Sequence, residues 1–269
     1  MLSIKHELVP SLLVSLTLGA SLMANAEGTL NLSVSEKAYV SKNQVMRLCI
    51  DPNWLPYEGL TAEGEYTGLI PEYMSEFESR TGLNFEVVRT ANWEETWELV
   101  TEGGCDVVSA VNQTQARAPY LSFTDPYITE PSVIVTKADR MDITQMGDLK
   151  GKRLAVVAGY ALDEKVSLDF PSIERVEAMD LAEGLAQVEA GTVDALAGSK
   201  FMMETFLASP AYQDLRIVNE ARYLYSLRVG IGRSSSQAYT ILNKAVKSLD
   251  GATHEAIRGR YAASMADGE

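Results

Sequence analysis

An α/β fold of two lobes is the architecture that this 269-residue sequence predicts. Short apolar segments typical of buried strands alternate with segments whose apolar residues recur at helical spacing. The alternation pauses after residue 111 and begins again near residue 152, which indicates two successive units. Strands and helices in alternation are typical of a parallel sheet with helices on its faces.

The first unit opens with an apolar strand at 45–50, which leads into a loop rich in glycine and proline. A helix follows this loop, because Pro71 suits the first turn of a helix and Gly82 suits its end. Residues 83–89 then have the pattern of a second strand.

A capping box begins the next helix of this unit. Asn92 is followed three residues later by Glu95, and the strand at 105–111 comes after a pair of glycines. Trp93 and Trp97 share one face of this helix, so we expect both rings to lie mostly in the core.

The second unit repeats the pattern, and a short tail follows it. The predicted segments are strands at 152–158, 173–179 and 193–197, helices at 159–166 and 180–191, then a strand at 223–231 and two helices. The tail is too short for a third domain, so we expect it to return to the first lobe. The predicted lobes are 27–136 with 221–269, and 137–220. A chain that crosses twice between lobes builds a two-strand hinge.

The first 26 residues have the features of a secretory signal peptide. A basic start precedes an apolar run at 8–23, and Ala24-Asn25-Ala26 provides small residues for cleavage after Ala26. A membrane anchor is the alternative, but the run is short and contains Pro10 and Gly19. The sequence therefore predicts an exported, periplasmic protein.

Composition narrows the classes of function. The net charge of −14 disfavours nucleic acid and anionic membranes as partners, since both attract basic proteins. Beyond the leader His254 is the only histidine, so neither a histidine triad nor a histidine metal cluster can form. No phosphate-binding loop is present. We expect no catalytic residues, metal or cofactor, and a monomer that is not an enzyme.

Two cysteines remain, Cys49 and Cys105, both at predicted strand positions. An even number of cysteines in an oxidising compartment permits a disulfide. Two buried thiols that pack as small apolar groups are the alternative.

Several short motifs, in order and spacing, resemble the type II periplasmic solute-binding proteins of family 3, which include histidine-binding proteins. The motifs are DPNWLPYE at 51–58, GLI at 68–70, GCDVV at 104–108, TQAR at 114–117, FTDPY at 123–127, DLKGK at 148–152 and GTVDA at 191–195. The segment at 35–39 and the cysteine pair resemble more closely the ligand-sensing domains of this fold in sensor kinases and diguanylate cyclases. The similarity extends from about residue 45 to residue 261.

This resemblance implies a Venus-flytrap, in which a ligand lies in the cleft between the two lobes. It also implies that the first and third strands of lobe 1 are neighbours, which favours a Cys49–Cys105 disulfide. By position, Arg117 matches the arginine that holds a ligand carboxylate, and Asp51 and Trp54 match residues that contact the rest of the ligand.

Four further positions complete the implied site. Asn112 stands where a serine commonly helps to bind the ligand, and Tyr160 and Ala161 begin the first helix of lobe 2, where hydroxyl residues often bind the carboxylate. Ser199 takes the place of the aspartate that usually holds an α-amino group, and Ala161 lacks the usual hydroxyl. Both departures weaken an amino-acid assignment.

The residue chemistry agrees with an anionic ligand. Arg117 offers a planar fork of donors that suits a carboxylate, although a surface arginine is the alternative. The helix that begins near Ala161 offers free N–H groups to an anion. Trp54 and Tyr57 would form an apolar wall, unless Tyr57 only packs beneath its loop, and Asp51 would accept a hydrogen bond or cap its turn.

We therefore expect a solute-binding protein that captures a small polar or anionic molecule, an amino acid or another carboxylate, for a membrane transporter. The alternatives are a ligand-sensing module that acts on a membrane signalling protein and, less favoured, an enzyme similar to cyclohexadienyl dehydratase.

Overall fold

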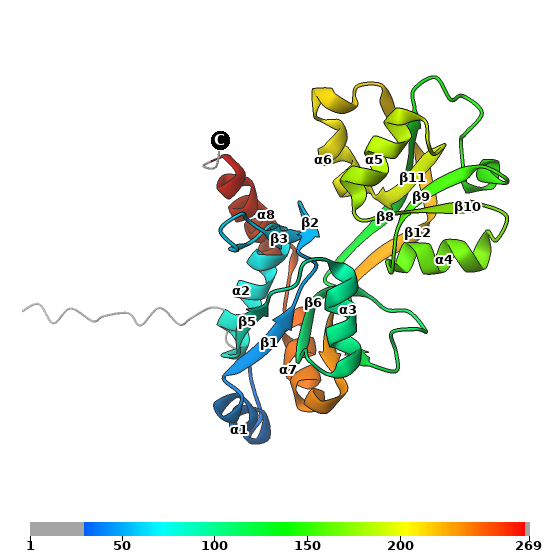
Figure 1. The fold of residues 1–269 in the computed structure, drawn as a ribbon. Helices are drawn as coiled ribbons and strands as arrows, with labels where there is room; N and C mark the ends of the chain where they lie inside the picture. Colours follow the sequence, from blue (N-terminus) through cyan, green and yellow to red (C-terminus); the bar gives the residue numbers. More distant parts are fainter. Residues whose placement is uncertain (1–29, 267–269) are drawn as a thin grey trace, which may run out of the picture.

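One curled sheet runs through the whole protein, and its two halves carry separate sets of helices (Figure 1). The computed structural model describes residues 30–266, so the predicted leader at 1–26 lies outside the described residues. The strands follow the order β10-β9-β11-β8-β12-β6-β1-β5, and β7 pairs with β12. The predicted α/β architecture with two lobes is confirmed.

Lobe 1 contains the N-terminal elements and the two last helices. Its members are α1 (Val34–Lys42), β1 (Val45–Cys49), β2 (Asn53–Trp54), β3 (Glu58–Leu60), β4 (Tyr66–Thr67), α2 (Leu69–Thr81), β5 (Asn84–Val88), α3 (Trp93–Glu102), β6 (Val107–Asn112), β7 (Leu121–Phe123), η3 (Arg233–Ser235), α7 (Ser236–Lys247) and α8 (Gly251–Ala266).

Lobe 2 contains the middle of the chain. Its members are η1 (Met146–Leu149), β9 (Arg153–Val157), α4 (Ala161–Asp169), β10 (Glu174–Ala178), α5 (Leu181–Ala190), β11 (Ala195–Ser199), α6 (Lys200–Leu207) and η2 (Pro210–Tyr212).

Two long antiparallel strands join the lobes, β8 (Ile128–Lys137) and β12 (Leu215–Gly232). In lobe 2, β8 pairs with β11, and in lobe 1, β12 pairs with β6 and β7. The strand predicted at 223–231 is therefore only the second part of β12. Strand β8 was not predicted, although its Val133-Ile134-Val135 run is typical of a strand. The chain crosses twice, as expected, while the lobe boundaries at 136/137 and 220/221 remain a prediction.

Helix ends follow the sequence signals closely. Gly82 ends α2 with a φ of 75°, a left-handed conformation that glycine adopts without strain. At the start of α3, the Asn92 side chain accepts a hydrogen bond from the N–H of Glu95 at 2.9 Å. Asp180 caps α5 in the same way, with a 2.8 Å bond from the N–H of Glu183.

The two cysteines form a disulfide at one end of lobe 1. Strand β1 is parallel to β6, with Leu48 opposite Val107. Cys49 ends β1 and Cys105 lies just before β6, which leaves their Cα atoms 5.7 Å apart. The register of β1 against β6 therefore brings the two cysteines close enough for a disulfide.

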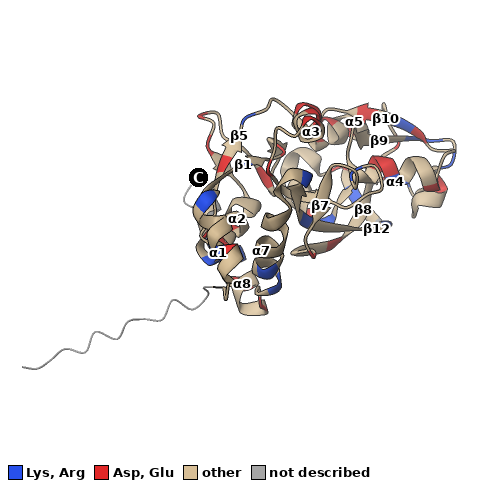
Figure 2. Cartoon of the chain, turned by 90° about the horizontal axis from the view of Figure 1, so that it is seen from below, with Lys and Arg blue, Asp and Glu red and all other residues tan. Residues whose placement is uncertain are grey.

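Surface charge agrees with the acidic composition. Acidic residues lie on the exposed face of α3 and on β10 (Figure 2).

Within residues 30–266, no helix is long and apolar enough to cross a membrane.

Candidate ligand-binding site

A small cavity lies where the carboxyl ends of β1 and β6 meet the start of α4 from the other lobe. Its volume is about 20 Å³, room for roughly one water molecule. Residues of both lobes and of the hinge line it: Asp51, Trp54, Trp93, Ala110, Val111, Asn112, Arg117, Tyr160, Ala161 and Tyr225. A larger ligand must therefore enter while the lobes are apart.

Arg117 is buried on the lobe 1 side of this cavity, with an exposure of 4%. Its Nη1 donates to the carbonyl of Asn112 at 3.2 Å, and its Nη2 donates across the cleft to the carbonyl of Gly159 at 2.8 Å. The guanidinium carbon lies 5.5 Å from the ring centre of Trp93 and 5.3 Å from that of Trp97. These rings stabilise the cation by a cation–π interaction.

Asp51 of lobe 1 faces Tyr160 of lobe 2. Its Oδ1 accepts from the N–H of Asn53 at 3.0 Å, and its Oδ2 accepts from the hydroxyl of Tyr160 at 2.5 Å. Burial, opposed by these hydrogen bonds, raises the pKa of Asp51 to about 6. The carboxyl group can therefore change its charge near neutral pH.

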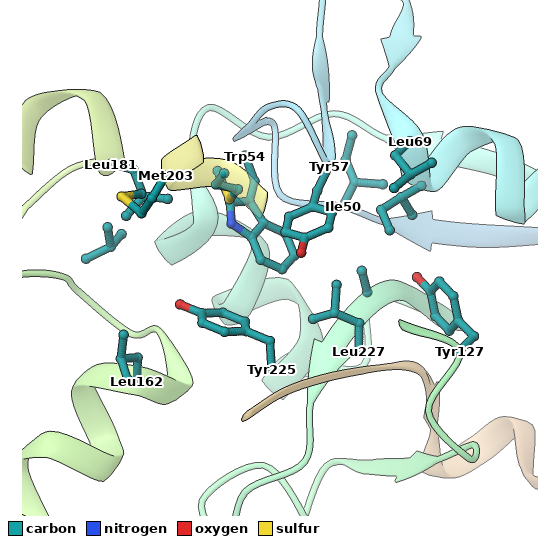
Figure 3. Packing of buried hydrophobic residues seen from close by; sticks show 14 of the residues in the cluster. Ile50, Trp54, Tyr57, Leu69, Tyr127, Leu162, Leu181, Met203, Tyr225 and Leu227 are labelled. Atoms are coloured by element: carbon teal, nitrogen blue, oxygen red, sulfur yellow. The ribbon is translucent and has the colours of Figure 1, made fainter. Parts of the chain in front are cut away.

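Trp54 supplies an unused donor to the cavity. The small sheet formed by β2, β3 and β4 holds its ring 4.7 Å from Tyr57 and 6.5 Å from Tyr225. In Figure 3 Trp54 lies next to Tyr57 and above Tyr225, with the lobe 2 side chains of Leu181 and Met203 on the left. Its Nε1 is buried and has no hydrogen-bond partner among the described residues. A buried donor without an acceptor is costly, so this N–H suits an acceptor atom of a ligand or a water molecule.

The start of α4 offers further donors. Tyr160 is the N-cap residue, and its side chain makes no capping bond; its hydroxyl instead donates to Asp51. Ala161 is the first helical residue and lines the cavity. The free N–H groups of such a turn attract anions.

Two predicted residues, Tyr57 and Ser199, lie beside the cavity rather than in its lining. The Tyr57 hydroxyl lies 3.2 Å from Ser199 Oγ and donates to the carboxylate of Glu130 on β8. Ser199 also caps α6 by accepting from the N–H of Met202 at 3.3 Å. In this structure the two residues connect lobe 1, lobe 2 and the hinge strand β8.

Residues 46–263 match the family of bacterial extracellular solute-binding proteins, family 3. This chain belongs to that family.

Relatives of known name include both sensors and binding proteins. The chain is 24% identical over 237 residues to the virulence sensor protein BvgS of Bordetella pertussis, a match that covers 87% of this chain and 19% of BvgS. It is 27% identical over 184 residues to the L-cystine-binding protein TcyA of Bacillus subtilis, covering 68% of this chain and 67% of TcyA. The chain thus spans about a fifth of the sensor's length.

The fold agrees with a solved structure of similar sequence identity. The periplasmic VFT2 domain of Bordetella pertussis BvgS has a TM-score of 0.77 and an identity of 23%, with 85% of this chain and 98% of that domain covered. The Venus-flytrap fold is therefore confirmed for this family member.

Sequence reasoning missed several residues of this site, among them three with large side chains. Trp93 is mostly buried, as expected, but it also lines the cavity and donates to the carbonyl of Gly159 at 3.2 Å. Tyr225 lines the cavity from β12, and Glu164 of α4 pairs with Arg117. Glu164 reaches Arg117 across the cleft and Tyr225 comes from the hinge strand β12, so no local pattern could have indicated them.

Proposed function

We propose that this chain is an exported receptor that encloses a small carboxylate-bearing molecule, an amino acid or another acid, between its two lobes. One observation supports this above the others. A buried guanidinium, a helix N-terminus and an unpaired indole N–H converge on a single interlobe cavity. Together they offer donors and positive potential to an anion, while Trp54 and Tyr225 offer apolar contact.

The ligand is best identified by what the protein carries. Purified protein is denatured, and the released small molecules are analysed by mass spectrometry. We expect a compound with at least one carboxylate, whose re-addition raises the melting temperature by mass action. A neutral or purely cationic compound that binds in its place contradicts the proposed ligand class.

We favour delivery of the ligand to a membrane transporter. The similarity to TcyA, an L-cystine-binding protein, supports this role. The similarity to BvgS supports a second role, in which the closed form acts on a membrane sensor. Uptake of the identified ligand, labelled, by cells with and without the gene separates the two. Lost uptake supports transport, whereas unchanged uptake with an altered transcriptional response to the ligand supports sensing.

Asp51 gives a specific reason to test the enzymatic alternative. Its carboxyl group has a pKa of about 6 and lies in the cleft, where it would be suited to donate a proton. Incubation with prephenate followed by product analysis tests a dehydratase similar to cyclohexadienyl dehydratase. We expect prephenate to remain unchanged.

Export completes the proposal. Cleavage after Ala26 would give a mature protein that begins at Glu27 in the periplasm. N-terminal sequencing of periplasmic material checks this, and recovery of Met1 contradicts it.

A further inference from the structure

The guanidinium of Arg117 already has a carboxylate partner within the chain. Its Nε lies 3.4 Å from Oε1 of Glu164, whose side chain is 29% exposed. Arg117 follows β6 in lobe 1, whereas Glu164 lies in the first turn of α4 in lobe 2. The pair therefore spans the cleft.

This ion pair is one of several contacts between the two lobes. The carbonyl of Gly159 in lobe 2 accepts from both Arg117 and Trp93 of lobe 1, and Tyr160 donates to Asp51. Among these contacts, only the pair with Glu164 joins opposite charges. A buried cation that loses its counter-charge is strongly destabilised, so closure depends on an anion next to Arg117.

We propose that Glu164 is a specificity residue that pairs with Arg117 until a ligand carboxylate displaces it. This inference rests on the proposed function, because the ligand carboxylate is assigned to Arg117 there. A ligand without an anionic group gains no contact with Arg117, because it cannot displace the carboxylate of Glu164. Glu164 thereby favours acids over neutral ligands and sets the affinity of the acids by competition.

Glu164 has room to leave Arg117. Its side chain also lines an outer groove of about 730 Å³, formed by the loop at 113–118 and by α4. Lys165 and Gln113 line the same groove and offer donors to a displaced carboxylate. A change of rotamer can thus move the Glu164 carboxylate away from Arg117 within this groove without unwinding α4.

The experiment uses small-angle X-ray scattering of the full ligand-free chain, with sodium acetate as a free carboxylate. Glu164→Ala removes the internal carboxylate, so we expect a larger radius of gyration than in the wild type. Acetate at high millimolar concentration should return the variant toward the compact wild-type curve, while sodium chloride at equal ionic strength should not. Asp163→Asn is the matched control, because Asp163 is the neighbouring acid on α4 and pairs with Arg175 inside lobe 2. Its curve should not change.

Glu164→Gln keeps the shape of the side chain and should open the protein in the same way, which covers a failure of the alanine variant to fold. If both variants stay as compact as the wild type, or if acetate leaves the open form unchanged, the proposal is overturned. These measurements need no natural ligand. A negative ligand screen therefore counts against the proposed function alone, and unchanged scattering counts against Glu164 alone.

Discussion

At the scale of the residue, Arg117 combines two roles that the sequence could only partly separate. The motif at 114–117 indicated a ligand contact, and the structure adds burial, two carbonyl partners and two indole rings. Removing the side chain should therefore affect folding as well as the proposed ligand binding. Because Arg117 also forms contacts between the lobes, substitutions at this position should lower stability.

Arg117→Ala should weaken binding of the identified acid by about 2–5 kcal/mol, the usual loss when a buried charge loses its partner. Arg117→Lys should restore only part of this, since an ammonium group cannot form the planar fork. Calorimetric titration measures both values, with Arg153→Ala on β9 as the control arginine. Unchanged affinity in Arg117→Ala would remove the anchor of the proposed site. The alanine variant should also melt at a lower temperature.

Glu58 connects a buried carboxyl group to the pH dependence of stability. The side chain is fully buried and accepts from the N–H of Asp51 at 3.0 Å, from Tyr66 at 2.7 Å and from Ser109 at 2.6 Å. Burial raises its pKa from 4.5 to about 8. The folded state thus binds a proton that the unfolded chain releases.

The consequence has a definite sign. The stabilisation is complete below pH 4.5 and is lost as the pH rises through about 8, so stability should fall across this window. Glu58→Gln keeps a neutral side chain at every pH and should flatten the fall between about pH 6 and pH 8. Asp51, with its pKa of about 6, still contributes at lower pH. Urea unfolding at several pH values tests this, with Glu98→Gln as control because Glu98 is exposed. If the free energy of unfolding falls equally steeply with pH in the two variants, the prediction is contradicted.

At the scale of the element, the helices were predicted better than the two strands that form the hinge. Gly82, Asn92 and Asp180 carry chemistry that acts within a few residues, so their positions set the ends of α2, α3 and α5. Strands β8 and β12 depend instead on partners far away in the sequence, and β12 is bulged. The candidate site follows the same division. Asp51, Trp54 and Arg117 lie in local motifs, whereas Tyr225 comes from the hinge strand β12 and Glu164 reaches Arg117 only across the cleft.

The disulfide is the element-scale feature with the clearest energetic consequence. Cys49 and Cys105 are 56 residues apart, so opening the bond should cost about 4 kcal/mol by the chain-entropy relation. Thermal unfolding with and without a phosphine reductant measures this loss, and the Cys49→Ser, Cys105→Ser double variant should match the reduced protein. Two free thiols in the denatured, unreduced protein would show that the bond does not form.

At the scale of the whole molecule, the hinge gives the lobes a shared core. One continuous buried cluster contains Leu48 and Ile241 of lobe 1 together with Leu154 and Leu196 of lobe 2. The sheet is also continuous, because β8 and β12 are paired along both lobes. If either lobe unfolded, apolar side chains of the hinge would become exposed to water. The remaining lobe would thereby lose part of the core that stabilises it.

We therefore expect the ligand-free chain to unfold in one cooperative transition rather than lobe by lobe. Differential scanning calorimetry should give a calorimetric enthalpy equal to the van't Hoff enthalpy, which is the criterion for a single cooperative unit. The control is Glu164→Gln, which should loosen the interlobe contact while leaving the hinge strands intact. If closure alone couples the lobes, this variant should split into two transitions. If the continuous sheet and core couple them, it should keep one transition at a lower temperature, and this second result is the one that the shared cluster predicts.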